Sequence, residues 1–177
     1  MTQHNETIGT VMITEEQIAA KAVEIGKRIE EEFKGQEIVM IGILRGATMW
    51  MAELMKRVNL DMVIDFMAVS SYGSATKTSG IVKINKDLDT DIAGKPVIIV
   101  EDIVDSGVTL NYLLGYMHGR GAKDVKVCAL LDKPAGRRVN IAVDYAGFEV
   151  DNRFIVGYGL DFDQRYRNLP YITWLEE

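Results

Sequence analysis

The sequence predicts an α/β protein with a mainly parallel, twisted sheet that helices flank on both faces. Apolar runs of strand length alternate with segments of helical period along the chain. Strands that alternate with helices imply a parallel sheet that is covered on both faces. Small or charged residues follow several runs, where ligands collect in such folds. A chain of 177 residues is long enough for one sizeable core, and we expect a single domain over residues 1–177.

The first half of the chain opens with a helix signal. Thr14 and Gln17 form a capping-box pattern, and apolar residues follow at helical spacing until Gly35: Ile18, Ala22, Ile25, Ile29 and Phe33. The next segments predict a strand over 37–44, a helix over about 48–57, a strand over 61–69, a polar mobile loop over 70–80 and a strand over 81–88.

The second half repeats this alternation. It predicts a central strand over 96–103, a helix over 108–119, a buried strand over 125–131 and short strands over 141–145, 154–158 and 171–175. We expect a small hood subdomain over the sheet, formed by the N-terminal segment and by residues from about 134 to 177.

Composition narrows the functional class. The chain is 47% hydrophobic and 26% charged, with a net charge of −6, which is ordinary for a globular domain and argues against a nucleic-acid partner. No apolar run is long enough to cross a bilayer, so we expect no membrane partner. Cys128 lies in an apolar strand pattern, which favours a core residue over a nucleophile. The lack of an export signal or a second cysteine favours the cytoplasm.

The most informative segment follows the central strand. Glu101 and Asp102 end an apolar run, and Asp105-Ser106-Gly107-Val108-Thr109 then opens a helix. Unpaired charge is expensive to bury, so a strand gains nothing structural from ending in two acids. Carboxylates can accept hydrogen bonds from sugar hydroxyls, and loop amides at a helix N-terminus can hold a phosphate. The pattern therefore predicts a sugar-phosphate site.

This segment resembles the phosphoribosyl-diphosphate (PRPP) motif of the type I phosphoribosyltransferases, and the resemblance extends in family order from about Ile13 to Tyr171. It implies that Glu101 and Asp102 hold the ribose, and that residues 105–109 hold the 5′-phosphate. Arg45-Gly46 resembles the pyrophosphate loop of that family, in which the peptide that matches Leu44–Arg45 is often cis. Ser71-Tyr72 resembles the Ser-Tyr pair of the family's lid.

The C-terminal segment resembles the purine-binding segment of the hypoxanthine–guanine phosphoribosyltransferases. The resemblance implies that Phe154 stacks on the base, that the Ile155 backbone contacts the purine edge and that Lys133 donates to O6. Asp161 would help to bind Mg²⁺, and Arg167 would contact pyrophosphate. Without the resemblance, Phe154 and Ile155 would be interpreted as core residues, and the two charged residues as ordinary surface residues.

The resemblance thus implies an enzyme that converts hypoxanthine or guanine and PRPP into IMP or GMP and pyrophosphate. Asp105 is the expected acid/base at purine N7, and Mg²⁺ is the expected cofactor, bound by Glu101, Asp102 and Asp161. A homodimer or homotetramer is also expected. Two alternatives stay open at this point: a regulator on the same fold that senses PRPP or a nucleotide, and a transferase that prefers xanthine or a pyrimidine.

Overall fold

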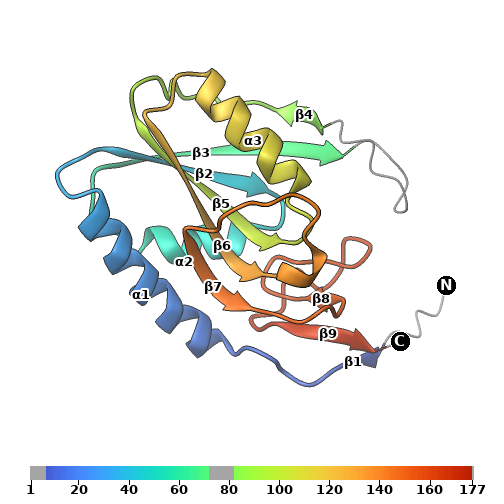
Figure 1. Cartoon of the computed structure of the whole chain (residues 1–177). Coiled ribbons are helices and arrows are strands. Elements are labelled where there is room, and N and C mark those ends of the chain that lie inside the picture. The colour runs from blue at the N-terminus through green and yellow to red at the C-terminus, as the bar shows by residue number, and fades with distance from the viewer. Residues whose placement is uncertain (1–6, 72–81, 177) are drawn as a thin grey trace.

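The computed structural model describes residues 7–71 and 82–176. Its main feature is a sheet of six strands, which runs through the centre of the molecule in Figure 1. The strand order is β4-β3-β2-β5-β6-β7. The bounds are β2 Ile38–Leu44, β3 Met62–Ser71, β4 Val82–Lys86, β5 Pro96–Val104, β6 Asp124–Asp132 and β7 Tyr145–Glu149. All neighbouring pairs are parallel except β3 with the edge strand β4. The predicted α/β class with a mainly parallel sheet is therefore confirmed.

Helices cover both faces of this sheet (Figure 1). Helices α1 (Glu15–Glu32) and α2 (Thr48–Met55) pack on one face and α3 (Val108–Gly119) on the other, and a short 3-10 turn, η1, spans Pro134–Gly136. Thr14 and Gln17 form the predicted capping box of α1, because the side chain of each accepts a hydrogen bond from the backbone N–H of the other. None of the helices within the described ranges is long and apolar enough to span a membrane.

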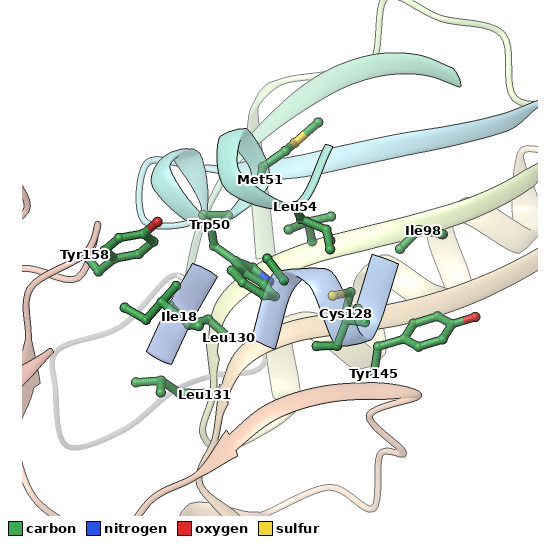
Figure 2. Packing of buried hydrophobic residues seen from close by; sticks show 14 of the residues in the cluster. Ile18, Trp50, Met51, Leu54, Ile98, Cys128, Leu130, Leu131, Tyr145 and Tyr158 are labelled. Carbon is green, nitrogen blue, oxygen red and sulfur yellow. The ribbon is translucent and has the colours of Figure 1, made fainter. Parts of the chain in front are cut away.

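Alternate residues of the central strands enter two separate hydrophobic clusters, as strand geometry requires. Met40, Ile98 and Cys128 face α1 and α2, whereas Ile41 and Ile99 face α3. Figure 2 shows side chains of α1, α2 and β6 meeting in the first cluster, with the fully buried Trp50 among them. Burial raises the pKa of the Cys128 thiol to about 12, which is consistent with the predicted core role.

A second, three-stranded sheet forms beside the carboxyl ends of the main strands. Its order is β1-β9-β8, with bounds Thr7–Ile8, Thr173–Glu176 and Ile155–Val156. It combines N- and C-terminal segments. Strand β7 also lies after residue 134, but it pairs with β6 in the main sheet. The hood subdomain over about 134–177 stays a prediction.

The short strand predicted over 141–145 is wrong. Only Tyr145 of this range is in a strand, and β7 continues from there to Glu149. The side chain of Asp144 accepts a hydrogen bond from the backbone N–H of Val127 at 2.8 Å. This N–H group of β6 is therefore not available to pair with the backbone of a longer β7. Ile141 and Val143 instead pack against the α3-side cluster without pairing.

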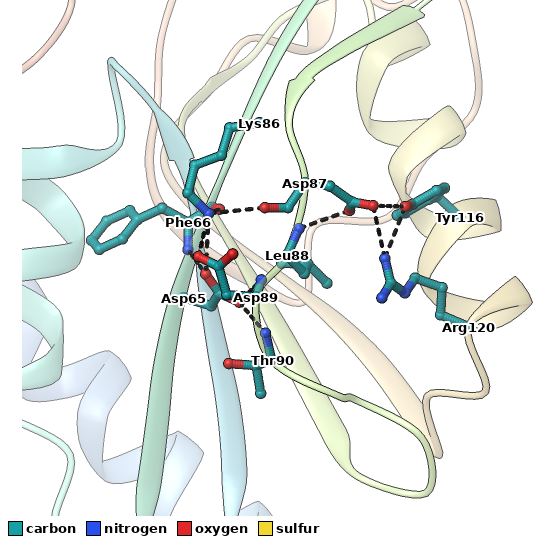
Figure 3. Close-up of polar contacts among 9 residues, drawn as sticks. All are labelled: Asp65, Phe66, Lys86, Asp87, Leu88, Asp89, Thr90, Tyr116 and Arg120. Atoms are coloured by element: carbon teal, nitrogen blue, oxygen red, sulfur yellow. Dashed lines mark hydrogen bonds and ion pairs between the residues drawn. The ribbon is translucent and has the colours of Figure 1, made fainter.

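Buried and exposed carboxylates hold the connection between β4 and β5 in place (Figure 3). Asp65 on β3 is 6% exposed and accepts hydrogen bonds from the backbone N–H groups of Phe66, Asp89 and Thr90. Lys86 lies 3.6 Å from the same carboxylate. A second set ties this connection to α3, since the Asp87 carboxylate accepts hydrogen bonds from Tyr116 and Arg120.

Candidate active site

Two adjoining hollows lie at the carboxyl ends of the parallel strands. The first, of about 250 Å³, is lined mainly by β5 and the loop that follows it: Ile43, Glu101, Ile103–Gly107, Thr109 and Leu110. The second, of about 240 Å³, also reaches the C-terminal segment and is lined by Asp102, Ile103, Asp105, Lys133, Arg153–Ile155, Leu160 and Asp161. Ile103 and Asp105 line both hollows, so Asp105 lies at the boundary between them.

The first hollow adjoins the N-terminus of α3. Gly107 caps this helix in the left-handed conformation, with φ of 78°, and has no side chain to supply a capping hydrogen bond. The first backbone N–H groups of a helix have no partner within the helix. In α3 these groups belong to the segment that is predicted to bind phosphate. Val108 N donates only a long hydrogen bond, 3.4 Å, to Ser106 Oγ. The loop therefore offers N–H donors to an anion.

Glu101 and Asp102 project to opposite faces of β5, and each lines a different hollow. Burial raises the pKa of Glu101 well above its ordinary value, and the neighbouring Asp102 charge adds to this. Burial also raises the pKa of Asp102, although the Ile103 N–H opposes the shift. In the part of the chain that the structure describes, neither carboxylate forms an ion pair with Lys or Arg. A cation or sugar hydroxyls would relieve this burial cost.

The loop after β2 approaches the same carboxylates. The peptide between Leu44 and Arg45 is cis, as the family pattern led us to expect. Gly46 packs directly on Asp102, because a Cβ at residue 46 would lie 1.6 Å from Asp102 Oδ2. On its other side, a Cβ on Gly159 would lie 2.0 Å from the Gly46 carbonyl oxygen. Only glycine fits between these neighbours.

Two arginines converge on one glutamine beside this loop. Arg45 donates a hydrogen bond to Gln164 Oε1 at 2.9 Å, and Arg167 donates to the same oxygen at 3.3 Å. Arg167 also forms an ion pair with Asp161 at 2.7 Å and donates to the Gly159 carbonyl oxygen at 2.7 Å. The arrangement gathers two guanidinium groups near the Asp102 carboxylate, where they can bind an anion.

Lys133 and Phe154, the two side chains predicted to contact the purine base, both line the second hollow. Lys133 Nζ lies 3.5 Å from Asp105 Oδ2 and donates a hydrogen bond to the Arg153 carbonyl oxygen at 3.3 Å. Phe154 is 53% exposed and meets the edge of Phe162 at a centroid distance of 5.4 Å. An exposed aromatic ring beside a hollow can stack on a flat ligand. Ile155 lines the hollow from β8 and is buried.

The structure brings nearly all of the predicted site residues together at one edge. Ser71 ends β3, and nothing is described of its side chain, whereas Tyr72 lies outside the described residues, so the lid stays a prediction. Three contributors were missed from the sequence: Arg153, Gln164 and Arg137. The contacts that bring Gln164 and Arg137 to the site join them to Arg45 and to the Asp105 carbonyl oxygen, which are distant in sequence, so no local pattern indicates them.

Comparisons with known proteins agree with this geometry. Residues 10–163 match the family model of the phosphoribosyl transferase domain. The chain is 49% identical over 169 residues to the hypoxanthine-guanine phosphoribosyltransferase of Bacillus subtilis, with 96% of this chain and 94% of that protein covered. It is 50% identical over 173 residues to the bifunctional protein TilS/HprT of Listeria monocytogenes, with 98% of this chain covered. The chain spans only about a quarter, 26%, of that longer relative.

The fold is also shared with solved structures. A crystal structure of a hypoxanthine-guanine phosphoribosyltransferase from Bacillus anthracis superposes with a TM-score of 0.91 and 42% identity, covering 97% of this chain and 100% of that one. The superposed region covers nearly the whole chain and therefore includes the main sheet and its helices.

Proposed function

This chain belongs to the phosphoribosyltransferase family, in its hypoxanthine–guanine branch, and on that premise we propose that it salvages 6-oxopurines. It transfers the 5-phosphoribosyl group of PRPP to N9 of hypoxanthine or guanine, and releases pyrophosphate. One observation carries this proposal: Asp105 lies at the boundary of two hollows, one lined by a phosphate-type loop and the other by Lys133 and Phe154. A ribose that spans the boundary would present C1′ to a base in the second hollow.

Each part of the site has a physical role in this reaction. The N–H groups and hydroxyls of residues 105–109 hold the 5′-phosphate at the α3 N-terminus. Glu101 and Asp102 hold the ribose hydroxyls, directly or through a metal ion. Arg45, Gly46 and Arg167 bind the departing pyrophosphate. Phe154 stacks on the purine, the Ile155 backbone contacts its edge, and Lys133 donates a hydrogen bond to O6.

Asp105 acts as the acid/base in the transfer step. The bond between purine N9 and C1′ forms as the bond from C1′ to the pyrophosphate oxygen breaks, and the proton on purine N7 passes to Asp105. The position of Asp105 between the two hollows supports this role, and Lys133 at 3.5 Å orients its carboxylate.

The donor set suits Mg²⁺ provided that the substrate contributes oxygen atoms. The half-buried Glu101 and Asp102 carboxylates supply hard oxygen ligands, and Asp161 is near enough to Asp102 for its charge to raise the pKa of that residue. Within residues 7–71 and 82–176, no three His, Cys, Asp or Glu side chains are close enough to form a metal site alone. When bound, Mg²⁺ neutralises pyrophosphate and makes it a better leaving group.

The activity is tested by incubating the protein with PRPP, Mg²⁺ and one base at a time: hypoxanthine, guanine, xanthine or uracil. We expect IMP and GMP to form with release of pyrophosphate. Turnover of xanthine or uracil alone would show that the base preference is wrong. Binding of PRPP without turnover of any base would favour a sensor on the same fold. We further expect a cytoplasmic protein that forms a homodimer or homotetramer. Size-exclusion chromatography with light scattering would test the oligomeric state.

A further inference from the structure

We propose that Arg137 is a positioning residue that turns the backbone N–H groups of the loop after β5 toward the 5′-phosphate. This inference rests on the proposed function and deepens it, because it assigns the loop's orientation to a residue outside the loop. Arg137 does not line either hollow, so it acts through the loop and not on the ligand itself.

The guanidinium of Arg137 binds the outer side of the loop. Its Nη1 donates hydrogen bonds to two successive carbonyl oxygens, those of Val104 and Asp105, the second at 2.7 Å. Its Nη2 forms an ion pair with Asp132, the last residue of β6, which fixes the guanidinium to the sheet. The Arg137 side chain is only 17% exposed, so solvent screens these contacts weakly.

The two residues after Arg137 bind one further carbonyl group of the loop. The backbone N–H groups of Arg138 and Val139 both donate to the Ser106 carbonyl oxygen, at 2.9 and 3.2 Å. Segment 137–139 thus binds three successive carbonyls, those of Val104, Asp105 and Ser106, from one side of the loop.

The geometry of the peptide unit explains how these contacts set the direction of the loop's backbone N–H groups. In a trans peptide the N–H of the next residue points away from the carbonyl. Drawing the three carbonyls toward segment 137–139 therefore turns the N–H groups of Asp105, Ser106 and Gly107 to the opposite side. These three residues line the first hollow, whereas segment 137–139 does not.

The acceptors around residue 137 require the side chain of an arginine. Two carbonyls and a carboxylate need several donors held in one plane, which a guanidinium provides and a lysine ammonium does not. Glutamine has a single NH₂ group and no charge for Asp132. Lysine keeps the charge but not the planar, forked arrangement of donors. The two substitutions therefore test the donor geometry and the charge separately.

The experiment compares IMP with inosine, which differ only in the 5′-phosphate, in calorimetric binding to the wild type and to Arg137→Gln, Arg137→Lys and Arg120→Gln. Arg120→Gln is the matched control, because Arg120 also pairs with an aspartate, Asp87, but on the far end of α3. We expect Arg137→Gln to bind IMP about 10- to 100-fold more weakly and Arg137→Lys to lie between it and the wild type. Inosine affinity should not change, which a general loss of structure would not allow.

The outcomes separate this inference from the proposed function. A wild type that binds IMP no better than inosine would overturn the proposed phosphate site itself. A wild type with a clear preference for IMP, retained in Arg137→Gln, would overturn only the role of Arg137. Equal losses for IMP and inosine would also overturn it, because they would show a purely structural role. If Arg137→Gln does not fold, Arg137→Lys decides the same question by the same ratio.

Discussion

Gly46 and Asp102 are in direct contact, and a single methyl group at residue 46 would lie 1.6 Å from the Asp102 carboxylate oxygen. The contact joins the loop after β2 to the carboxyl end of β5, two strands that pair in parallel at the centre of the sheet. Each of the following predictions depends on such a close relationship between segments distant in sequence.

The first prediction concerns Gly46→Ala. The added Cβ must displace Asp102 or the loop, and a displacement of about 1 Å in a catalytic site can cost about 10²-fold in rate. We expect a loss of that size in kcat/KM for PRPP, measured by IMP formation. Gly115→Ala is the control, because a Cβ there meets nothing within 4 Å and should stabilise α3 by about 0.5–1 kcal/mol. Full activity of Gly46→Ala would contradict the close packing.

The second prediction concerns Asp105→Asn. Asparagine keeps the shape and can still contact Lys133, but it cannot take the N7 proton. We expect kcat to fall about 10²- to 10⁴-fold with little change in the KM for PRPP, measured in steady-state kinetics. Asp91→Asn removes a charge from the connection between β4 and β5 and should leave kcat unchanged. Full turnover by Asp105→Asn would show that the acid/base lies elsewhere.

The third prediction concerns Lys133→Ala and base selectivity. Loss of a charged donor to O6 should lower kcat/KM for hypoxanthine about 10- to 100-fold, with a smaller effect on the dissociation constant of PRPP. The preference for hypoxanthine over adenine should fall as well, since adenine has an amine at that position. Lys123→Ala, which breaks a surface contact with Gln36, is the control. An equal loss of hypoxanthine turnover and PRPP affinity would indicate that Lys133 is structural.

The fourth prediction concerns pH and Asp65, the carboxylate that holds the β4–β5 connection in Figure 3. Burial alone would raise its pKa, but the N–H groups of Thr90, Phe66 and Asp89 outweigh burial and lower it. A lowered folded-state pKa stabilises the protein above the unfolded-state value, and this contribution disappears as pH falls through the folded-state value.

We therefore expect Asp65→Asn to lower the free energy of unfolding by about 1–3 kcal/mol at pH 7, measured by urea denaturation. The difference in stability between the wild type and the variant should shrink as pH falls below the ordinary aspartate pKa, and should vanish once the lowered folded-state pKa has been passed. A gap that stays constant from neutral pH to acid would contradict the assigned ionic role of Asp65.

Much of the fold could be predicted because its strands are buried on both faces. Strand β2 is apolar throughout, and β5 and β6 each contain a long run of buried apolar residues, so the apolar pattern identifies all three. The edge elements could not be predicted in this way. Strand β1 has only two residues and exists because β9 offers it an edge, and the start of β7 depends on the Asp144 side chain.

The same distinction applies to the residues of the candidate site, since some form a local sequence pattern and others do not. Residues 101–109 follow one another and carry their chemistry in a local pattern, so the sequence alone indicated them. Gln164 also binds Arg45 and Arg137 also binds the Asp105 carbonyl, and these contacts join residues that are distant in sequence. Residues that position others are identified from contacts, which only the folded structure provides.

The contact between Arg153 and Trp174 has a practical consequence. The Arg153 guanidinium lies 4.6 Å from the Trp174 ring centroid, and the Arg153 carbonyl oxygen accepts a hydrogen bond from Lys133 at the base end of the site. The only other tryptophan in the sequence, Trp50, is fully buried beneath the sheet. The fluorescence of the Trp174 indole should therefore change when a purine binds at Lys133. Binding of the base can then be followed in solution without an added label.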